Sequence, residues 1–381
     1  MAAALHQLRR RAATMTLQRR GLPSIAWPEP GRVGIVGIGQ LGRAVGGNLI
    51  RDGLRPVLHD RLGEDHCRDL LDRGATWAAT PRELAEACDV VITGLPEPAH
   101  TAAAMGLDAE GAAADDGILA GLRPGSIWVE HGTTDPNATL RVREAVEARG
   151  AAAVAAPVTG GMQLLSAGKM VTLVGCDDEA AWSRVAPLVA LSAPRIVRCG
   201  KFGHETVIKI LTNMLCAVQD CAMGEAMMVA KKEGVDLKLL FDAMRVSSGN
   251  SFCWETEFAR VVDETYYPDF TAKMMLKDIR LGQDIAARND IPMLVHGLCA
   301  ELYRTSIAKY GDDCGSTIPV KLVEDACRTR LSDDALKATF KDWTYTSEID
   351  AGSYVIHHKN IDNPHTAWET TKAPEAAAPH S

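Results

Sequence analysis

The sequence predicts an α/β protein, in which an N-terminal domain built on a parallel sheet precedes an all-helical C-terminal domain. Two observations support this prediction. Short apolar runs alternate with helical patterns as far as about residue 195, and a GxGxxG glycine pattern joins the first apolar run to the first helix. Beyond that point the strand signals fade and long helical patterns take over. We therefore expect a sheet domain at 31–195, a helical substrate and dimerisation domain at 196–330, and two flanking segments, 1–30 and 331–381.

The flanking segments differ in composition from the two domains. Residues 1–30 contain clusters of arginine separated by small and apolar residues, with no acidic residue before Glu29. This composition is typical of a transit peptide and predicts the mitochondrial matrix; the alternative is an exposed extension of a cytoplasmic bacterial chain rich in alanine and arginine. The C-terminal extension, 331–381, is polar and aromatic by turns, and we expect it to be partly disordered, above all in its last dozen residues.

The bulk composition narrows the class of protein. A chain of 381 residues with 46% hydrophobic content can form two domains that each have a core. The net charge of -8 argues against a nucleic-acid partner, and no run reaches the roughly 18 uninterrupted apolar residues that a membrane-spanning helix needs. The ten cysteines show no CxxC pairs, so we expect reduced thiols and no metal site.

The first apolar run, residues 33–36, leads directly into a glycine turn. Gly37, Gly39 and Gly42 have the spacing in which the first glycine permits a tight turn, the second admits a pyrophosphate, and the third lets helix and strand pack closely. Gln40 and Leu41 open the helix, whose N-terminal amides would face the phosphates. This arrangement predicts a Rossmann-type dinucleotide-binding domain; the alternative is a tight turn that binds no ligand.

A second apolar run, residues 55–60, ends in an acidic residue. Asp60 follows Gly39 by 21 residues, where a carboxylate accepts hydrogen bonds from a ribose hydroxyl. Such a carboxylate favours NAD, because it repels the 2′-phosphate of NADP. Arg61, the next residue, could bind that phosphate, so NADP stays possible.

Two further strands are predicted at 89–95 and 126–130. Ligands of parallel sheets bind beyond the carboxyl ends of the strands, so Leu95, Pro96 and Thr133 are expected beside the cofactor. The alternative for Thr133 is a structural role, in which its side chain caps the helix that begins near Pro136.

The helical half begins with one long pattern, residues 201–232, followed by shorter ones at 236–246, 271–288 and 292–309. Its expected buried stripe has apolar residues three to four positions apart, namely Leu211, Leu215, Val218 and Ala222.

Two polar residues of the long helix share a face. Lys209 and Asn213 are four residues apart, and a lysine whose pKa is lowered by burial suits acid–base chemistry. The alternative is that Lys209 pairs with Glu205 on a solvated face.

Four motifs in order resemble those of the β-hydroxyacid dehydrogenases, and most closely the 3-hydroxyisobutyrate dehydrogenase branch. They lie between about residues 32 and 328, and their sequences are VGIVGIGQLGRAVGGNL, AAPVTGG, GKFGHETVIKILTNML and FTAKMMLKDIRLGQDIA. The resemblance implies an NAD(P)-dependent dehydrogenase or reductase of a small 3-hydroxyacid or its semialdehyde, assembled as a homodimer or homotetramer. Alternatives are an NADPH-dependent reductase of the glyoxylate or succinic-semialdehyde type, and a catalytically silent NAD-binding dimerisation module.

The resemblance also implies roles for single residues. Lys209 would be the general acid/base and Asn213 would orient the substrate. The remaining site residues would hold the substrate carboxylate or line the pocket beside the cofactor, and they are Thr133, Thr159, Gly160, Gly161, Phe270 and Lys277. Asp278 is expected to cap or to pair rather than to react.

The sequence departs from the family pattern at three positions. Gly132 stands where the family has a serine, Ala155 where it has an acid, and Glu205 where it has a glycine. A carboxylate one turn before Lys209 could raise the pKa of the lysine, crowd the nicotinamide, or attract a substrate with a cationic or hydroxylated end. We therefore expect a substrate other than plain 3-hydroxyisobutyrate. Thr212 replaces the histidine of the 6-phosphogluconate dehydrogenases, which argues against oxidative decarboxylation of a sugar phosphate.

Overall fold

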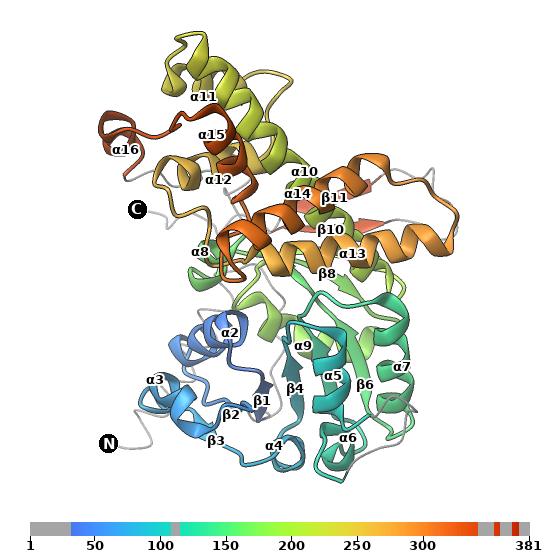
Figure 1. Ribbon diagram of the computed structural model, residues 1–381. Coiled ribbons are helices and arrows are strands. Elements are labelled where there is room, and N and C mark those ends of the chain that lie inside the picture. The colour runs from blue at the N-terminus through green and yellow to red at the C-terminus, as the bar shows by residue number, and fades with distance from the viewer. Residues whose placement is uncertain (1–31, 108–114, 342–353, 359–367, 373–381) are drawn as a thin grey trace, which may run out of the picture. The chain divides into compact units, whose positions relative to one another are not determined.

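The computed structural model describes residues 32–107, 115–341, 354–358 and 368–372, and these form two compact units (Figure 1). The first unit runs to Lys209 and includes the two C-terminal strands, and the second begins at Ile210. The transit peptide expected at 1–30 and the chain end after Lys372 lie outside the described residues.

The first unit is built on a twisted sheet whose neighbours are mostly parallel. Its strand order is β11-β10-β9-β8-β6-β5-β4-β1-β2-β3, and β7 pairs with β8. The pairs β6–β8, β7–β8 and β10–β11 are antiparallel, and the other pairs are parallel, which confirms the predicted parallel sheet. The strands are β1 (Val33–Val36), β2 (Val57–His59), β3 (Thr76–Trp77), β4 (Val90–Thr93), β5 (Ile127–Glu130), β6 (Ala152–Ala155), β7 (Val158–Thr159), β8 (Val171–Gly175), β9 (Arg195–Gly200), β10 (Tyr354–His358) and β11 (Trp368–Lys372).

Helices cover both faces of this sheet, and each face has its own core. Alternate residues of one strand point to opposite faces. In β5, Ile127 and Val129 belong to one hydrophobic cluster and Trp128 belongs to the other. Strands buried on both sides are therefore continuously apolar, as the sequence is here. The helical elements of this unit are α2 (Gln40–Arg51), η1 (Glu64–Cys67), α3 (Arg68–Leu71), α4 (Pro81–Ala87), α5 (Pro98–Met105), α6 (Ile118–Gly121), α7 (Pro136–Glu147), α8 (Met162–Ser166) and α9 (Glu179–Ala190).

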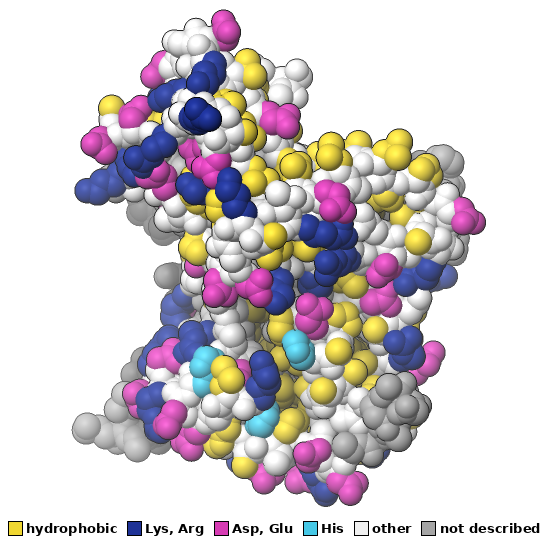
Figure 2. Space-filling view, viewed as in Figure 1, with side chains coloured by type: hydrophobic (Ala, Val, Ile, Leu, Met, Phe, Trp, Pro, Cys, Tyr) yellow, Lys and Arg dark blue, Asp and Glu magenta, His cyan; other side chains and the backbone are white. Residues whose placement is uncertain are grey.

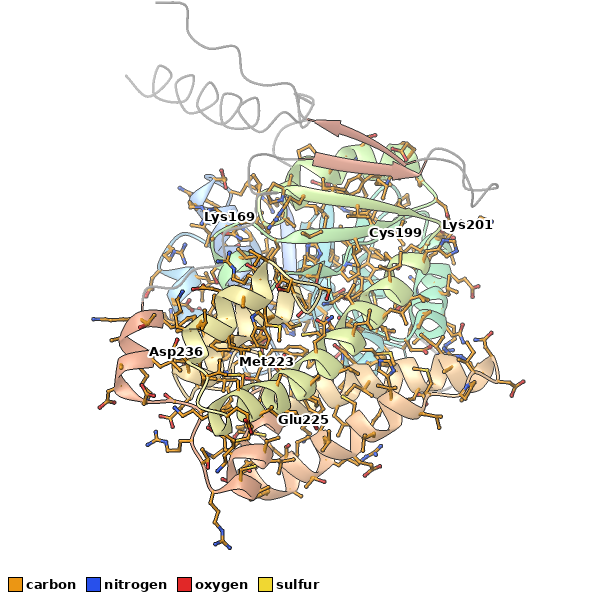
Figure 3. The ribbon with its side chains drawn as sticks, turned by 90° about the horizontal axis from the view of Figure 1, so that it is seen from above. Lys169, Cys199, Lys201, Met223, Glu225 and Asp236 are labelled. Atoms are coloured by element: carbon orange, nitrogen blue, oxygen red, sulfur yellow. The ribbon has the colours of Figure 1, made fainter. Side chains whose placement is uncertain are left out.

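The sheet continues beyond the point where strand signals were expected to fade. Strand β9 runs from Arg195 to Gly200, and its arginines hide its strand character in the sequence. The Arg198 guanidinium pairs with Glu179 and lies over the Trp182 ring, so this charged side chain is stabilised on a covered strand. Outside β9, the antiparallel pair β10 and β11 extends the same sheet, as Figure 3 shows beside the strand that carries Cys199.

In the described part of the second unit every element is a helix, which confirms the predicted all-helical domain. The elements are α10 (His204–Lys232), whose first turn belongs to the first unit, α11 (Leu237–Arg245), α12 (Phe252–Val262), α13 (Ala272–Arg288), α14 (Leu294–Tyr310), α15 (Pro319–Cys327) and α16 (Asp334–Phe340). Their core contains an aromatic cluster in which the Phe241, Phe258 and Phe340 rings are in mutual contact.

The predicted buried stripe of α10 is wrong by one position. Leu211 and Leu215 are 49% and 55% exposed, whereas Ile210 and Met214 are buried against Leu281 of α13. The error arises because α10 carries apolar residues on more than one face, so spacing alone does not identify the covered face. For the same reason, the length and composition of α10 would suffice for a membrane-spanning helix. The core helix of a soluble protein can meet the same two criteria.

Candidate active site

The glycine turn between β1 and α2 is shaped by two close approaches and one open position. Gly37 has φ of +94°, and a Cβ there would lie 2.4 Å from the Leu95 side chain. A Cβ on Gly42 would lie 1.9 Å from the Gly37 carbonyl oxygen, so helix and turn meet only because the side chain is absent. A Cβ on Gly39, in contrast, would meet nothing within 4 Å. The open space lies at the N-terminus of α2, where a pyrophosphate would bind.

Asp60 is fixed at the end of β2 by backbone donors. Its Oδ2 accepts from Ile38 N at 2.6 Å, and its Oδ1 accepts from Leu62 N at 2.9 Å. The carboxylate is buried beside the glycine turn, whereas Arg61 is exposed. Each carboxylate oxygen keeps a lone pair that can accept from a ribose hydroxyl.

The loop after β5 is held by a buried carboxylate that the sequence did not identify. Glu130 accepts from Thr93 Oγ1 at 3.0 Å, from Thr101 Oγ1 at 3.4 Å and from Gly132 N at 2.5 Å. A Cβ on Gly132 would lie 2.8 Å from Glu130 Oε1 and 3.0 Å from Leu95 O. Gly132, which stands where the family has a serine, therefore lets this loop pack tightly against the end of β4.

His131, in the same loop, is buried, and its Nδ1 donates to Ala156 O at 2.6 Å. Burial lowers the pKa of His131 from its usual value, so the ring is neutral and ties this loop to β6.

The helix-cap alternative for Thr133 is wrong. The N-cap of α7 is Asp135, whose Oδ1 accepts from Asn137 N and Ala138 N at 3.0 Å each. Thr133 lies half-buried in the loop beyond β5, and Leu95 and the exposed Pro96 lie beyond β4. All three follow the carboxyl ends of adjacent parallel strands, where a ligand of this sheet would lie.

Thr159, Gly160 and Gly161 form a sharp turn between β7 and α8. Thr159 pairs with Val171 in the sheet, and the two glycines follow with φ of +118° and +87°. These left-handed conformations favour glycine. Successive glycines of this kind let backbone N–H groups approach an anion without a side chain in the way.

Lys209 and Glu205 are both buried, so the alternative that they pair on a solvated face is wrong. Lys209 is 8% exposed and Glu205 is 0% exposed. The Glu205 carboxyl accepts from Gly203 N at 2.8 Å and from Thr206 Oγ1 at 2.7 Å. It also lies against the Cα of Gly175, where a Cβ would come 1.6 Å from Glu205 Oε2. Burial raises the pKa of Glu205, which opposes its ionisation.

In the second unit, Asn213, Lys277 and Asp278 form one polar cluster between α10 and α13. Asn213 Nδ2 donates to Asp278 Oδ2 at 2.6 Å, and Lys277 Nζ lies 2.6 Å from Asp278 Oδ1. Asp278 is buried and therefore pairs, as expected, rather than facing solvent. Phe270 is half-buried at the edge of the helical core, just before Thr271 caps α13.

The site residues expected from the sequence thus form two groups. The glycine turn, Asp60, the two loops beyond β4 and β5, the Thr-Gly-Gly turn and Lys209 belong to the first unit. Asn213, Lys277 and Phe270 belong to the second unit. Lys209 and Asn213 stand on either side of the unit boundary but lie one turn apart on α10.

Two sequence-family models match the chain. Residues 32–200 match the NAD binding domain of 6-phosphogluconate dehydrogenase, and residues 203–323 match a model described as NAD-binding of NADP-dependent 3-hydroxyisobutyrate dehydrogenase. The two matches meet at the start of α10.

Curated relatives cover most of both chains. The mitochondrial 3-hydroxyisobutyrate dehydrogenases of Homo sapiens and Mus musculus are 31% and 30% identical over 287 residues, which are 73% of this chain and 82% of each relative. The NAD-dependent L-serine dehydrogenase of Pseudomonas aeruginosa is 30% identical over 280 residues, which are 72% of this chain and 91% of the relative. Among solved structures, a 3-hydroxyisobutyrate dehydrogenase from Salmonella typhimurium is similar with a TM-score of 0.67 and 26% identity, over 77% of this chain and 99% of that one.

Proposed function

Because the chain belongs to the β-hydroxyacid dehydrogenase family, we propose that it interconverts a small 3-hydroxyacid and its semialdehyde, with Lys209 as general acid/base. The chain is an NAD(P)-dependent oxidoreductase that acts on a CH–OH group. The observation that carries this proposal is the burial of Lys209 one helical turn from Asn213 on α10. A buried amine that shares a helix face with a hydrogen-bonding amide suits proton transfer to a bound hydroxyl.

In the oxidative direction, Lys209 takes the proton of the substrate hydroxyl. The bound nicotinamide supplies the hydride acceptor, so the carbinol carbon loses hydride while its oxygen loses a proton. In the reductive direction, Lys209 returns the proton to the oxygen.

The remaining residues hold the substrate in position. The Gly160 and Gly161 amides bind the substrate carboxylate, and Thr133 and Thr159 contribute hydroxyl groups. Asn213 donates its amide N–H to Asp278, which fixes the orientation of the amide that would position the substrate. Lys277 adds positive charge on the same helix as Asp278.

The cofactor residues fit a dinucleotide, and we propose that NAD is preferred to NADP. Asp60 supports this preference, because its two backbone hydrogen bonds hold a negative charge where the adenosine ribose would lie. The Asp60→Asn variant should raise kcat/KM for NADP relative to NAD by at least 10-fold. Arg61→Ala is the matched control and should lower only the NADP value; a wild-type chain that prefers NADP would contradict the proposal.

The substrate is tested by a panel of small hydroxyacids. The relatives are named for 3-hydroxyisobutyrate and L-serine, so both belong in the panel, with 3-hydroxypropionate as the unsubstituted parent. The hypothesis that Glu205 attracts a cationic substrate loses its basis, because the described contacts of that carboxyl are with its own helix end and with Gly175. A substrate other than 3-hydroxyisobutyrate stays a prediction. It fails if 3-hydroxyisobutyrate is the best substrate of the panel.

Two alternative functions are separated by activity measurements. A glyoxylate or succinic-semialdehyde reductase would turn over those aldehydes with NADPH faster than any 3-hydroxyacid with NAD. A catalytically silent dimerisation module would be unaffected by Lys209→Ala, whereas the proposed enzyme should lose roughly 10³-fold or more in kcat with cofactor affinity unchanged. Lys201→Ala, at an exposed lysine before the same helix, is the control.

We also propose a homodimer or homotetramer formed through the second unit. Leu211 and Leu215 of α10 and Leu294, Val295 and Leu298 of α14 are exposed apolar side chains. Figure 2 shows such side chains along the outer edge of the helical unit. A surface of this kind usually marks an interface. Leu298→Glu should shift the mass measured by light scattering towards the monomer, and Val246→Glu, at an exposed position after α11, should not.

For the cell compartment we propose the mitochondrial matrix, which the arginine-rich composition of residues 1–30 supports. Residues 1–31 fused to a fluorescent protein in a eukaryotic cell should direct it to mitochondria; a diffuse signal would contradict the proposal.

A further inference from the structure

Two helices of the second unit carry the same kind of ligand pair at the same spacing. On α10, Cys216 and Asp220 are four residues apart, and on α12, Cys253 and Glu257 are four residues apart. Side chains at this spacing lie one above the other on one helix face. We call these four residues the α10–α12 cluster.

The structure brings the two pairs together. Cys253 Sγ lies 2.8 Å from Cys216 Sγ, and Cys216 Sγ lies 4.0 Å from Asp220 Oδ2. One ligand atom from each of Cys216, Asp220 and Cys253 lies within 4.8 Å of the others. Two sulfurs and one carboxylate therefore converge, and Glu257 lies one helical turn beyond Cys253 on α12.

The two carboxyls have oxygens that the described residues leave without a hydrogen bond. Asp220 is 0% exposed and Glu257 is 7% exposed, yet Asp220 Oδ1 and Glu257 Oε2 have no hydrogen-bond partner in the described part of the chain. A buried carboxylate oxygen without a partner is destabilising by roughly 2–7 kcal/mol, so each of these two atoms calls for a partner such as a bound ion.

We propose that the α10–α12 cluster binds a zinc ion through the converging Cys216, Cys253 and Asp220, with Glu257 as the fourth ligand. Two sulfur ligands select a soft divalent cation over magnesium or calcium, and carboxylate oxygens complete a tetrahedral zinc site. A disulfide between the cysteines would account for the close sulfurs but would leave both carboxylate oxygens without a partner. A tetrahedral ion with Zn–S distances of about 2.3 Å separates its sulfurs by roughly 3.8 Å, so binding moves the two thiols about 1 Å apart.

The site is structural, because four protein ligands leave no position for a substrate. Cys216 is three residues beyond Asn213 on α10, so the ion would clamp the part of α10 that carries Asn213 onto α12. Bundle cores accept metal sites of this kind from side chains on facing helices. The sequence alone predicted no metal site, because the two ligand pairs are separated by 37 residues and contain no CxxC motif.

The test uses the full chain, purified under reducing conditions and stripped of metal. We expect it to bind one zinc ion per chain in competition with a chromophoric chelator, and cobalt to give the thiolate charge-transfer band and intense visible absorption of a tetrahedral site. Cys253→Ser and Asp220→Asn should each weaken zinc binding at least 100-fold. Cys314→Ser, at a half-buried cysteine of the same unit outside the cluster, is the matched control and should bind as wild type does.

If the variants fail to fold, X-ray absorption spectroscopy of the wild-type protein with zinc bound still identifies the atoms that coordinate the ion. Two sulfurs at about 2.3 Å with oxygens at about 2.0–2.2 Å are expected. A shell of oxygen and nitrogen only, or zinc binding that survives Cys253→Ser, would overturn the proposal. The proposal would also be overturned if the reduced chain failed to bind zinc at micromolar concentration and air oxidation formed a disulfide between Cys216 and Cys253.

Discussion

The glycine turn of the first unit and the polar clusters of the second unit prepare for ligands by opposite means. Around Gly37, Gly39 and Gly42 the chain removes side chains, so that backbone and helix terminus can approach a ligand. Around Asn213 and Asp278 the chain buries side chains that orient one another. A backbone site tolerates no added atoms at its tight points, whereas a side-chain site fails when one partner is removed.

The largest effect should come from adding one methyl group to the glycine turn. Gly42→Ala puts a Cβ 1.9 Å from the Gly37 carbonyl oxygen, where only backbone movement can relieve the clash. We expect a loss of roughly 3 kcal/mol or more in the free energy of unfolding and no measurable NAD binding. Chemical denaturation and isothermal titration calorimetry measure the two quantities.

Gly39→Ala is the matched control, because its Cβ would meet nothing within 4 Å and its φ of -73° suits alanine. The stability of this variant should stay within about 0.5 kcal/mol of wild type. Its NAD affinity should nevertheless fall about 10-fold or more, because the methyl group occupies the space that the pyrophosphate needs. Unchanged NAD affinity in Gly39→Ala would break the backbone-site interpretation.

The second-largest effect should come from removing the acceptor of the side-chain cluster. Asp278→Ala removes the acceptor of the Asn213 Nδ2 hydrogen bond and the carboxylate that pairs with Lys277. We expect kcat/KM to fall about 10- to 100-fold, because a hydrogen bond to a charged group contributes about 1.5–3 kcal/mol. Asp278→Asn keeps an acceptor and should recover part of the loss.

Asp284→Ala, at an exposed position of α13, serves as the control and should leave steady-state kinetics unchanged. Equal losses in Asp278→Ala and Asp284→Ala would mean that the buried cluster has no positioning role.

The same contrast explains what the sequence could and could not predict. The glycine turn was predictable because its geometry is local: three glycines within six residues and one acid at the end of the next strand. The partners of Asn213 and Glu130 were not, because packing brings them from 65 and 37 residues away. Strand β9 was missed because it contains arginines whose partners lie elsewhere in the chain: Arg198 pairs with Glu179 and lies over the Trp182 ring. Turns can be predicted from local conformational rules, whereas the pairing of polar groups that are distant in the sequence becomes visible only in the folded structure.

A third effect tests the tight contact between Gly175 and Glu205 in the first unit. Gly175→Ala would bring a Cβ to 1.6 Å from Glu205 Oε2, so the buried carboxyl must move. We expect a loss of about 1–3 kcal/mol in the free energy of unfolding, measured by urea denaturation. Glu205→Ala removes the clashing group, so the double variant should be more stable than the sum of the two single changes predicts. Additive losses would show that the two residues do not share this space.

The smallest effect is the pH dependence that Glu205 itself contributes. Burial raises the pKa of Glu205 above its usual 4.5, so the folded chain holds this proton at pH values where the unfolded chain has released it. The stabilising contribution is therefore complete below pH 4.5 and is lost as the pH rises through the folded-state pKa. Glu205→Gln carries no such proton, so its advantage in stability over wild type should grow between pH 5 and pH 8. A constant difference between the two chains across that range would mean that the carboxyl is already ionised in the fold, with its hydrogen bonds from Gly203 N and Thr206 Oγ1 outweighing its burial.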